Sequence, residues 1–298
     1  MSAELSTSTR RPFGVARTWG LLGRSRSSLY AARKRRVEPT PPPCRRGPKT
    51  ELSDEALTQK IREVLAASPF LGEGHRKVWA RLRFAGVRTS KKRVLRLMRQ
   101  AGLLAPVRAL RVLGPRAHEG TILTAKPDQM WGTDLTSVMT LLDGVVSVFA
   151  TVDHCTAECL GSHAAKSATR FEALEPIRQA VRACFGSYRK GIAEDMTLRH
   201  DHGSQYLSDH FQSELRFLGI TSSPSFVRAP EGNGCIERFF RTLKEQLLWV
   251  RVFSTAEDVR QAVAEWVKTY NQHWLLERHR FRSPAQARAD WLALPKAA

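Results

Sequence analysis

The sequence predicts an α/β domain, built on a mixed five-stranded sheet with flanking helices, preceded by small all-α helix-turn-helix units. Two observations predict this class. Between residues 51 and 112, short helical patterns begin at serines and end at glycines, which are common helix caps. From residue 127 onward the apolar period changes to two and then alternates between strand and helix spacing.

The distribution of charge distinguishes the same two regions. The chain has a net charge of +20, and residues 1–126 carry all of it, because residues 127–298 hold equal numbers of basic and acidic side chains. A basic region joined to a neutral body is typical of proteins that bind a polyanion such as DNA. The basic residues punctuate short helices, and this pattern favours nucleic acid over a membrane surface.

Composition restricts the remaining classes. A chain of 298 residues with 42% apolar content is long enough for two or three domains with a substantial core. No apolar run approaches the ~20 residues of a membrane span, and no apolar stretch follows the first basic residues as in a secretory signal. The five cysteines are odd in number and scattered, which predicts reduced thiols in the cytoplasm. Strand alternation explains Cys155 and Cys159, near His154 and His163, better than a zinc site does.

The basic part divides into four segments. Residues 1–36 predict a basic arm with a partial helix-turn-helix, although a solvated basic helix is an equal alternative. Residues 37–50 form a proline-rich linker that cannot continue a helix. Residues 51–112 form a helix-turn-helix DNA-binding domain, and residues 113–126 a connector.

Three helices are predicted in the helix-turn-helix domain, over residues 54–67, 74–85 and 91–101. In the third, the basic side chains lie opposite the apolar stripe, at Lys92, Arg96 and Arg99. A basic outer face on the last helix of such a unit is suited to a DNA groove. The alternative is a solvated face without a ligand.

Residues 127–253 are expected to form the sheet domain. The predicted elements are strands 131–139, 144–153, 158–164, 196–199 and 220–223, and helices 169–185 and 209–218. Pro176 is expected to kink the first helix or to delay its start. Residues 254–298 form a C-terminal helical segment, with a helix beginning at Thr255.

Three acidic residues are the candidate catalytic and metal-binding groups. Asp134 lies within a predicted strand, Asp201 follows another strand, and Glu237 lies on a helix, with 35 residues between Asp201 and Glu237. Carboxylates that converge from such elements can hold two divalent cations, the apparatus of phosphoryl transfer on nucleic acid. Asp153 and Asp195 are expected to be structural.

The helix that carries Glu237 has an informative pattern. Its apolar residues should pack on the sheet, and they are Ile236, Phe239, Leu243 and Leu247. Arg241 and Lys244 share an edge with Glu237, and they are suited to binding DNA phosphates beside the metals. The alternative is a surface ladder of ion pairs.

The sequence around the acids resembles a known family. The segments WGTDLT, HDHGSQY and PEGNGCIERFFRTLK occur in that order around Asp134, Asp201 and Glu237. They resemble the catalytic core of the retroviral-integrase and DDE-transposase superfamily, and within it the OrfB-type transposases of bacterial insertion sequences. His200 stands where a serine is frequent in the family, and Glu231-Gly232 where a small residue and Asp often stand.

The resemblance implies a ribonuclease H-like fold and a DNA transposase that cleaves and joins strands at the ends of an insertion sequence. Mg²⁺ would be the cofactor, with Mn²⁺ able to substitute, held by Asp134, Asp201 and Glu237. The partners would be the element's terminal repeats, target DNA and further copies of the chain. The working enzyme is either this chain alone or a fusion with an upstream helix-turn-helix frame. A metal-dependent nuclease without strand joining and a domesticated DNA-binding regulator are the alternatives.

Overall fold

The computed structural model describes residues 3–37, 51–106, 122, 124–225 and 233–294. Two compact units divide the chain, Met1–Glu51 and Leu52–Ala298. Nearly all of the predicted proline-rich linker, most of the connector and the turn at 230–232 lie outside the described residues.

The first unit contains two helices, α1 (Gly14–Leu21) and α2 (Arg26–Val37). A turn at Gly23, with a positive φ of 63°, separates them, as the sequence predicts. Thr18 is buried and donates a hydrogen bond from its hydroxyl to the carbonyl of Gly14.

The second unit begins with three helices, α3 (Asp54–Ala67), α4 (His75–Phe84) and α5 (Lys91–Gln100). Their starts follow from local chemistry, because Ser53 and Ser90 accept hydrogen bonds from backbone N–H groups in the first turns of α3 and α5. Their apolar faces form one small core of Leu57, Ile61, Val78, Leu82, Val94, Leu97 and Met98. The three predicted helices are therefore present.

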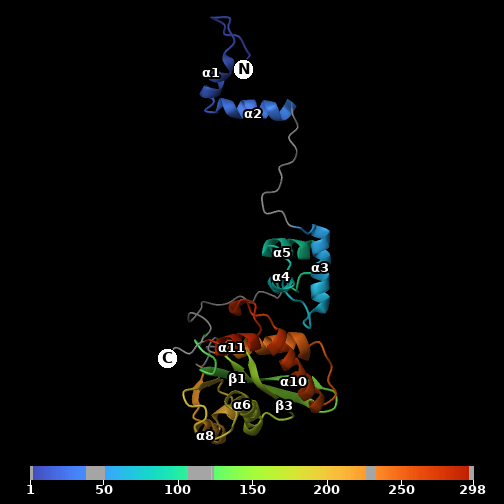
Figure 1. Ribbon diagram of the computed structural model, residues 1–298, viewed down its shortest axis with the longest axis vertical. Coiled ribbons are helices and arrows are strands. Elements are labelled where there is room, and N and C mark those ends of the chain that lie inside the picture. Colours follow the sequence, from blue (N-terminus) through green and yellow to red (C-terminus); the bar gives the residue numbers. More distant parts are fainter. Residues whose placement is uncertain (1–2, 38–50, 107–121, 123, 226–232, 295–298) are drawn as a thin grey trace. The chain divides into compact units, whose positions relative to one another are not determined.

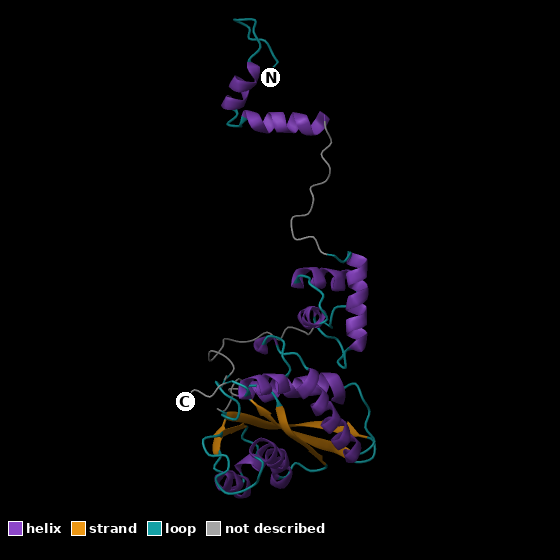
Figure 2. Cartoon of the chain, in the orientation of Figure 1, coloured by secondary structure: helices purple, strands orange, loops and turns teal. Residues whose placement is uncertain are grey.

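A five-stranded mixed sheet follows, made of β1 (Met130–Thr140), β2 (Gly144–Asp153), β3 (Cys159–Ala165), β4 (Thr197–His200) and β5 (Thr221–Pro224). The spatial order is β3-β2-β1-β4-β5. β1, β2 and β3 pair antiparallel, whereas β4 and β5 run parallel to β1. This is the predicted ribonuclease H-like arrangement, and Figure 2 shows the sheet between layers of helices.

Helices cover both faces of the sheet (Figure 1). One face packs against α6 (Arg170–Phe185), α7 (Ser204–Leu207) and α8 (Asp209–Leu218). The other packs against α9 (Gly234–Leu243), the π-helix η2 (Lys244–Leu248) and α10 (Ala256–His273). A 3-10 turn η3 (Glu277–His279) and α11 (Pro284–Leu292) complete the C-terminal segment.

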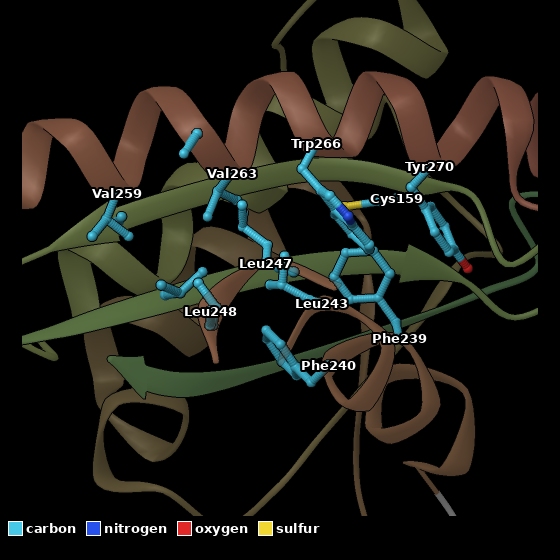
Figure 3. Close-up of a cluster of buried hydrophobic side chains, with 14 of the residues drawn as sticks. Cys159, Phe239, Phe240, Leu243, Leu247, Leu248, Val259, Val263, Trp266 and Tyr270 are labelled. Carbon is cyan, nitrogen blue, oxygen red and sulfur yellow. The ribbon is translucent and has the colours of Figure 1, made fainter. Parts of the chain in front are cut away.

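One of the two cores beside the sheet lies between β2, β3 and the helices α9, η2 and α10. In Figure 3, the side chains of Val259, Val263, Trp266 and Tyr270 point from α10 towards Phe239 and the rest of α9. All four predicted apolar positions of the α9 region are buried, namely Ile236, Phe239, Leu243 and Leu247. The periodicity of the sequence therefore orients α9 on the sheet.

The helix predicted over residues 169–185 is present as α6, which begins at Arg170, is capped by Thr169 and continues through Pro176. The predicted later start is wrong. A Cβ at Gly161 of β3 would lie only 2.0 Å from the carbonyl oxygen of Pro176, so this glycine lets the helix approach the strand closely. The free energy gained by burying α6 against the sheet therefore exceeds the cost of the hydrogen bond that Pro176 cannot donate.

The C-terminal segment contacts the first helices of the second unit. Phe70 packs edge-on against Trp274, with ring centroids 4.9 Å apart, and Arg76 pairs with Glu277 at 2.7 Å. No helix in the described part of the chain combines the length and the apolar character that a membrane span requires.

Candidate active site

Two of the candidate carboxylates come from neighbouring parallel strands, Asp134 from within β1 and Asp201 from the residue that follows β4. Gly132 of β1 pairs with Arg199 of β4, and Asp134 and Asp201 each follow two residues later. Alternation places each Asp on the same side of its strand as that pair. β1 and β4 therefore deliver the two carboxylates at one level of the sheet, about 5 Å apart between strands.

Glu237 comes from the helix that covers this part of the sheet. α9 contacts β1, and Glu237 is exposed in its first turn. Its charge acts on Asp134 together with that of Asp201. The structure therefore brings the three predicted acids into one neighbourhood, although residues 201 and 237 belong to elements far apart in sequence.

The surroundings of Asp134 raise its pKa. Burial, first, and then the charges of Asp201 and Glu237 raise the pKa of Asp134 to about 6. The backbone N–H of Leu135, which donates to Asp134 Oδ1 at 2.8 Å, and the charge of Lys244 oppose this increase. A half-buried carboxylate beside two like charges is an arrangement that a divalent cation would stabilise.

Across the described ranges, no three His, Cys, Asp or Glu side chains are close enough together to form a metal site as they stand. The donor set nevertheless fits Mg²⁺, a hard cation that uses one or two carboxylates plus substrate phosphates and water. Asp134, Asp201 and Glu237 are the residues that could hold it.

The residues around Asp201 have structural roles on either side of it. Asp201 Oδ1 accepts a hydrogen bond from the N–H of Gly203 at 2.8 Å, which fixes the turn after β4. His200 is fully buried on the opposite side of the sheet, where it contacts Ser222 and the ring of Tyr206. His202 is exposed. The sequence predicts that His200 points away from the Asp201 side, and the structure places it there.

The two cations predicted on the α9 edge differ in their surroundings. Arg241 is half-exposed and pairs with Glu245 at 3.0 Å, a residue outside the alternative ladder of Glu237, Arg241 and Lys244. Lys244 lies near enough to Asp134 to lower its pKa. Lys244 begins the π-helix η2, where the N–H of Trp249 bonds to its carbonyl oxygen. Such π-turns occur often at functional sites.

Asp153 and Asp195, the two acids expected to be structural, lie elsewhere. Asp153 is fully buried at the end of β2, where it accepts hydrogen bonds from the N–H and hydroxyl of Thr156. Burial raises its pKa, against those bonds and the charge of Arg288. Asp195 is exposed in the loop before β4 with a φ of 66°. Their positions are those of structural residues.

The predicted DNA-contacting helix, α5, presents two exposed cations, Lys92 and Arg99. Arg96 is half-buried, and its guanidinium donates to Asp54 Oδ2 at 2.7 Å and to Gln100 Oε1 at 3.1 Å. The Arg96 and Arg93 guanidinium groups lower the pKa of Asp54. Arg96 therefore ties α5 to α3, a role that the sequence pattern did not predict.

Three further residues near the carboxylates were missed. Arg199 is 7% exposed on β4 and donates to Ser223 Oγ at 2.8 Å. Tyr206 of α7 is fully buried, and its pKa is raised by burial and then by the charges of Asp134 and Asp201. Asn233 is 5% exposed and donates to the carbonyl of Thr133. Only the position of Asn233, four residues before Glu237, gave a signal in the sequence.

Comparison with known families gives matches to two kinds of domain. A model described as an HTH-like domain matches residues 51–110. Two models described as an integrase core domain match residues 124–230 and 218–274. The integrase core matches include Asp134, Asp201 and Glu237.

Several curated proteins are similar over most of the chain. The transposase for insertion sequence element IS629 of Shigella sonnei is 26% identical over 295 residues, which cover 95% of this chain and 94% of that protein. The transposase InsD for insertion element IS2D of Escherichia coli K12 is 27% identical over 285 residues, with 91% and 92% covered. A putative transposase for IS986/IS6110 of Mycobacterium tuberculosis is 28% identical over 240 residues, with 76% and 84% covered.

Solved structures also match. A chain of the simian T-cell lymphotropic virus intasome aligns with a TM-score of 0.48 and 19% identity, covering 74% of this chain and 73% of that chain. The HTLV-2 integrase catalytic core domain, solved with magnesium, aligns with a TM-score of 0.41 and 17% identity, covering 55% and 98%.

Proposed function

Because the chain belongs to the insertion-sequence transposases with an integrase core domain, we propose that it cuts and joins DNA at the ends of its own element. The observation that carries the proposal is the position of Asp134 and Asp201 at one level of β1 and β4, with Glu237 above them on α9. The three acids are the catalytic residues. Asp134 and Asp201 bind one or both divalent cations, and Glu237 completes the second position.

Mg²⁺ bound there would activate the attacking hydroxyl and stabilise the leaving 3′-oxygen, and Mn²⁺ can replace it. The protein's part is to hold the carboxylates in place. The N–H of Leu135 orients Asp134, and the N–H of Gly203 orients Asp201. Each hydrogen bond is accepted by one carboxylate oxygen, so the other oxygen of the same carboxylate is available to coordinate a metal ion. No covalent link between protein and DNA is required.

The cations of the second unit bind the DNA in this proposal. Lys244 lies beside Asp134 and contacts the phosphate next to the scissile bond. Arg241 contacts the adjacent backbone from its half-exposed position on α9. Lys92, Arg96 and Arg99 of α5 contact the terminal repeat, and Arg96 also holds α5 against α3. Two element ends must be joined, so the active form is an oligomer of this chain on DNA.

The test is a nicking and joining assay on the DNA that flanks the gene, with Mg²⁺ or Mn²⁺. The variants are Asp134→Asn, Asp201→Asn and Glu237→Gln. The matched control is Asp195→Asn, which makes the same chemical change at an exposed residue in the left-handed region, where Asn is well tolerated. Each carboxylate variant should lower the rate by about 100-fold or more, whereas the control should retain wild-type activity.

The products separate this proposal from its two rivals. Cleaved and joined products that vanish in the three variants support the transposase. Cleavage without joining indicates a nuclease. Tight, salt-sensitive binding without cleavage, both for this chain and for a fusion to the upstream frame, indicates a DNA-binding regulator.

A further inference from the structure

Gly132 of β1 lies beneath the start of the helix that carries Glu237. It is buried, and a Cβ placed on it would lie 2.8 Å from Asn233 Oδ1 and 2.8 Å from His154 Nε2. Real Cβ atoms do not approach polar atoms this closely. The missing side chain at Gly132 therefore makes the room into which Asn233 and His154 project.

Asn233 does not act as an ordinary helix cap. It precedes α9, the position where Asn usually accepts a hydrogen bond from the first turn, but its side chain makes no such bond. Its amide instead donates across to the strand, from Nδ2 to the carbonyl oxygen of Thr133 at 3.3 Å. The residue is only 5% exposed. Asn233 thus links α9 to β1.

The link matches the spacing of the catalytic residues. Asn233 immediately precedes α9, and Glu237 follows four residues later in the first turn of the helix, about 6 Å along its axis. Gly132 and Asp134 are two residues apart on a strand and on one face, about 6.6 Å. Asn233 therefore fixes the start of α9 over Gly132, and Glu237, in the first turn of α9, acts through its charge on Asp134, two residues along β1 from Gly132.

We infer that Asn233 is a positioning residue that, seated over Gly132, sets the register in which α9 crosses β1 and so holds Glu237 above Asp134. The inference rests on the proposed metal-dependent function. Asn233 is too deeply buried to bind DNA itself, and Oδ1 has no hydrogen-bond partner among the described residues. Its effect on the reaction passes through Glu237.

The test compares Asn233→Ala, Gly132→Ala and the double variant. The readout is Mn²⁺ affinity of the DNA-free protein, measured by electron paramagnetic resonance, with thermal unfolding as a check that each variant folds. The matched control is Asn271→Ala. Asn271 also links a helix to a strand, with hydrogen bonds of 3.0 and 2.8 Å to the backbone of Cys159, but it lies on α10 and β3, away from the carboxylates.

Asn233→Ala and Gly132→Ala should each weaken Mn²⁺ binding by about tenfold or more, as outer residues that orient ligands usually do. Asn271→Ala should lower the melting temperature and leave the affinity unchanged. The double variant should bind Mn²⁺ no more weakly than Gly132→Ala, because the alanine methyl at 132 then clashes with His154 alone and no longer with the Asn233 amide as well.

Wild-type Mn²⁺ affinity in a folded Asn233→Ala overturns the inference, even if Gly132→Ala fails to fold. A loss of affinity in Asn271→Ala equal to that in Asn233→Ala also overturns it, because a general loosening of the fold would then explain both. Metal binding does not require turnover. Wild-type protein that binds Mn²⁺ but does not cleave DNA therefore counts against the proposed function alone.

Discussion

Asp134 of β1 and Asp201, the first residue after β4, each follow two residues beyond Gly132 and Arg199, which pair across the two parallel strands. Both are on the side of the sheet that α9 covers. Strand pairing therefore fixes the positions of two of the three carboxylates. The position of Glu237 depends on how α9 crosses the two strands.

The stability of the metal-free protein should depend on the protonation of Asp134. Its pKa is about 6 in the folded chain, against an ordinary value of 3.8. An acid whose pKa is raised by folding favours the folded state when protonated, so stability should fall as pH rises from about 4 to about 6 and then level off. At pH 7 the ionised Asp134 therefore lowers the free energy of unfolding by up to about 3 kcal/mol.

Asp134→Asn should remove this penalty. In urea unfolding without metal at pH 7, the variant should be more stable than wild type by about 1–3 kcal/mol, and the gain should disappear near pH 4. Asp195→Asn serves as the control and should show no such pH-dependent gain. A difference between variant and wild type that is constant from pH 4 to pH 7 would refute the assignment.

Saturating Mg²⁺ should stabilise the wild-type chain in the absence of DNA. Binding to the folded state alone adds about 2.7 kcal/mol at a hundredfold excess over Kd, which corresponds to a rise of about 5–10 °C in Tm for a domain of this size. Differential scanning calorimetry can check this. Asp201→Asn should lose most of the shift, and an equal shift in that variant would place the metal elsewhere.

Arg288 of α11 is expected to be a major structural residue. Its side chain is 14% exposed, donates to Asp128 Oδ2 at 2.7 Å and contacts Glu158, with the buried Asp153 3.9 Å away. Arg288→Ala leaves these acids unpaired, so unfolding in urea should show a loss of about 3–5 kcal/mol.

The control for Arg288 is Arg282→Ala, because the Arg282 pair with Asp290 is more than half exposed on both sides. Its loss should cost less than about 1 kcal/mol. Equal effects of the two substitutions would contradict the role assigned to Arg288.

The exposed and half-buried cations of α5 should behave differently. Lys92→Ala and Arg99→Ala should weaken binding to the terminal repeat and reduce the salt dependence of affinity by about one unit of slope each, without a change in stability. Arg96→Ala should also lower the stability of the protein, because its guanidinium bonds to Asp54. Fluorescence anisotropy at several salt concentrations measures the first effect, and thermal unfolding the second.

Lys268→Ala is the matched control for these cations, since Lys268 is exposed on α10. Equal losses of affinity for Lys268→Ala and Lys92→Ala would mean that α5 contributes only general charge.

Much of the fold could be predicted from the sequence because the signals are local. The helices predicted to begin at residues 54, 91 and 255 begin within one residue of those positions, where Ser53, Ser90 and Thr255 cap them. Alternating apolar residues gave all five strands within one or two residues of their observed ends. The three sequence segments around Asp134, Asp201 and Glu237 resemble the integrase core, and the integrase core domain matches include all three residues.

Tertiary structure decided what depends on contacts between distant segments. Pro176 is accommodated inside α6 because Gly161, on strand β3, leaves room for the carbonyl oxygen of Pro176. Arg96 links two helices and is not only a surface cation, because Asp54 on the neighbouring helix α3 accepts a hydrogen bond from its guanidinium. The crossing of α9 over β1, with Asn233 above Gly132, could not be predicted from the periodicity of apolar residues in the sequence. Sequence determines which side chains an element offers, whereas the close packing of elements determines which of them meet.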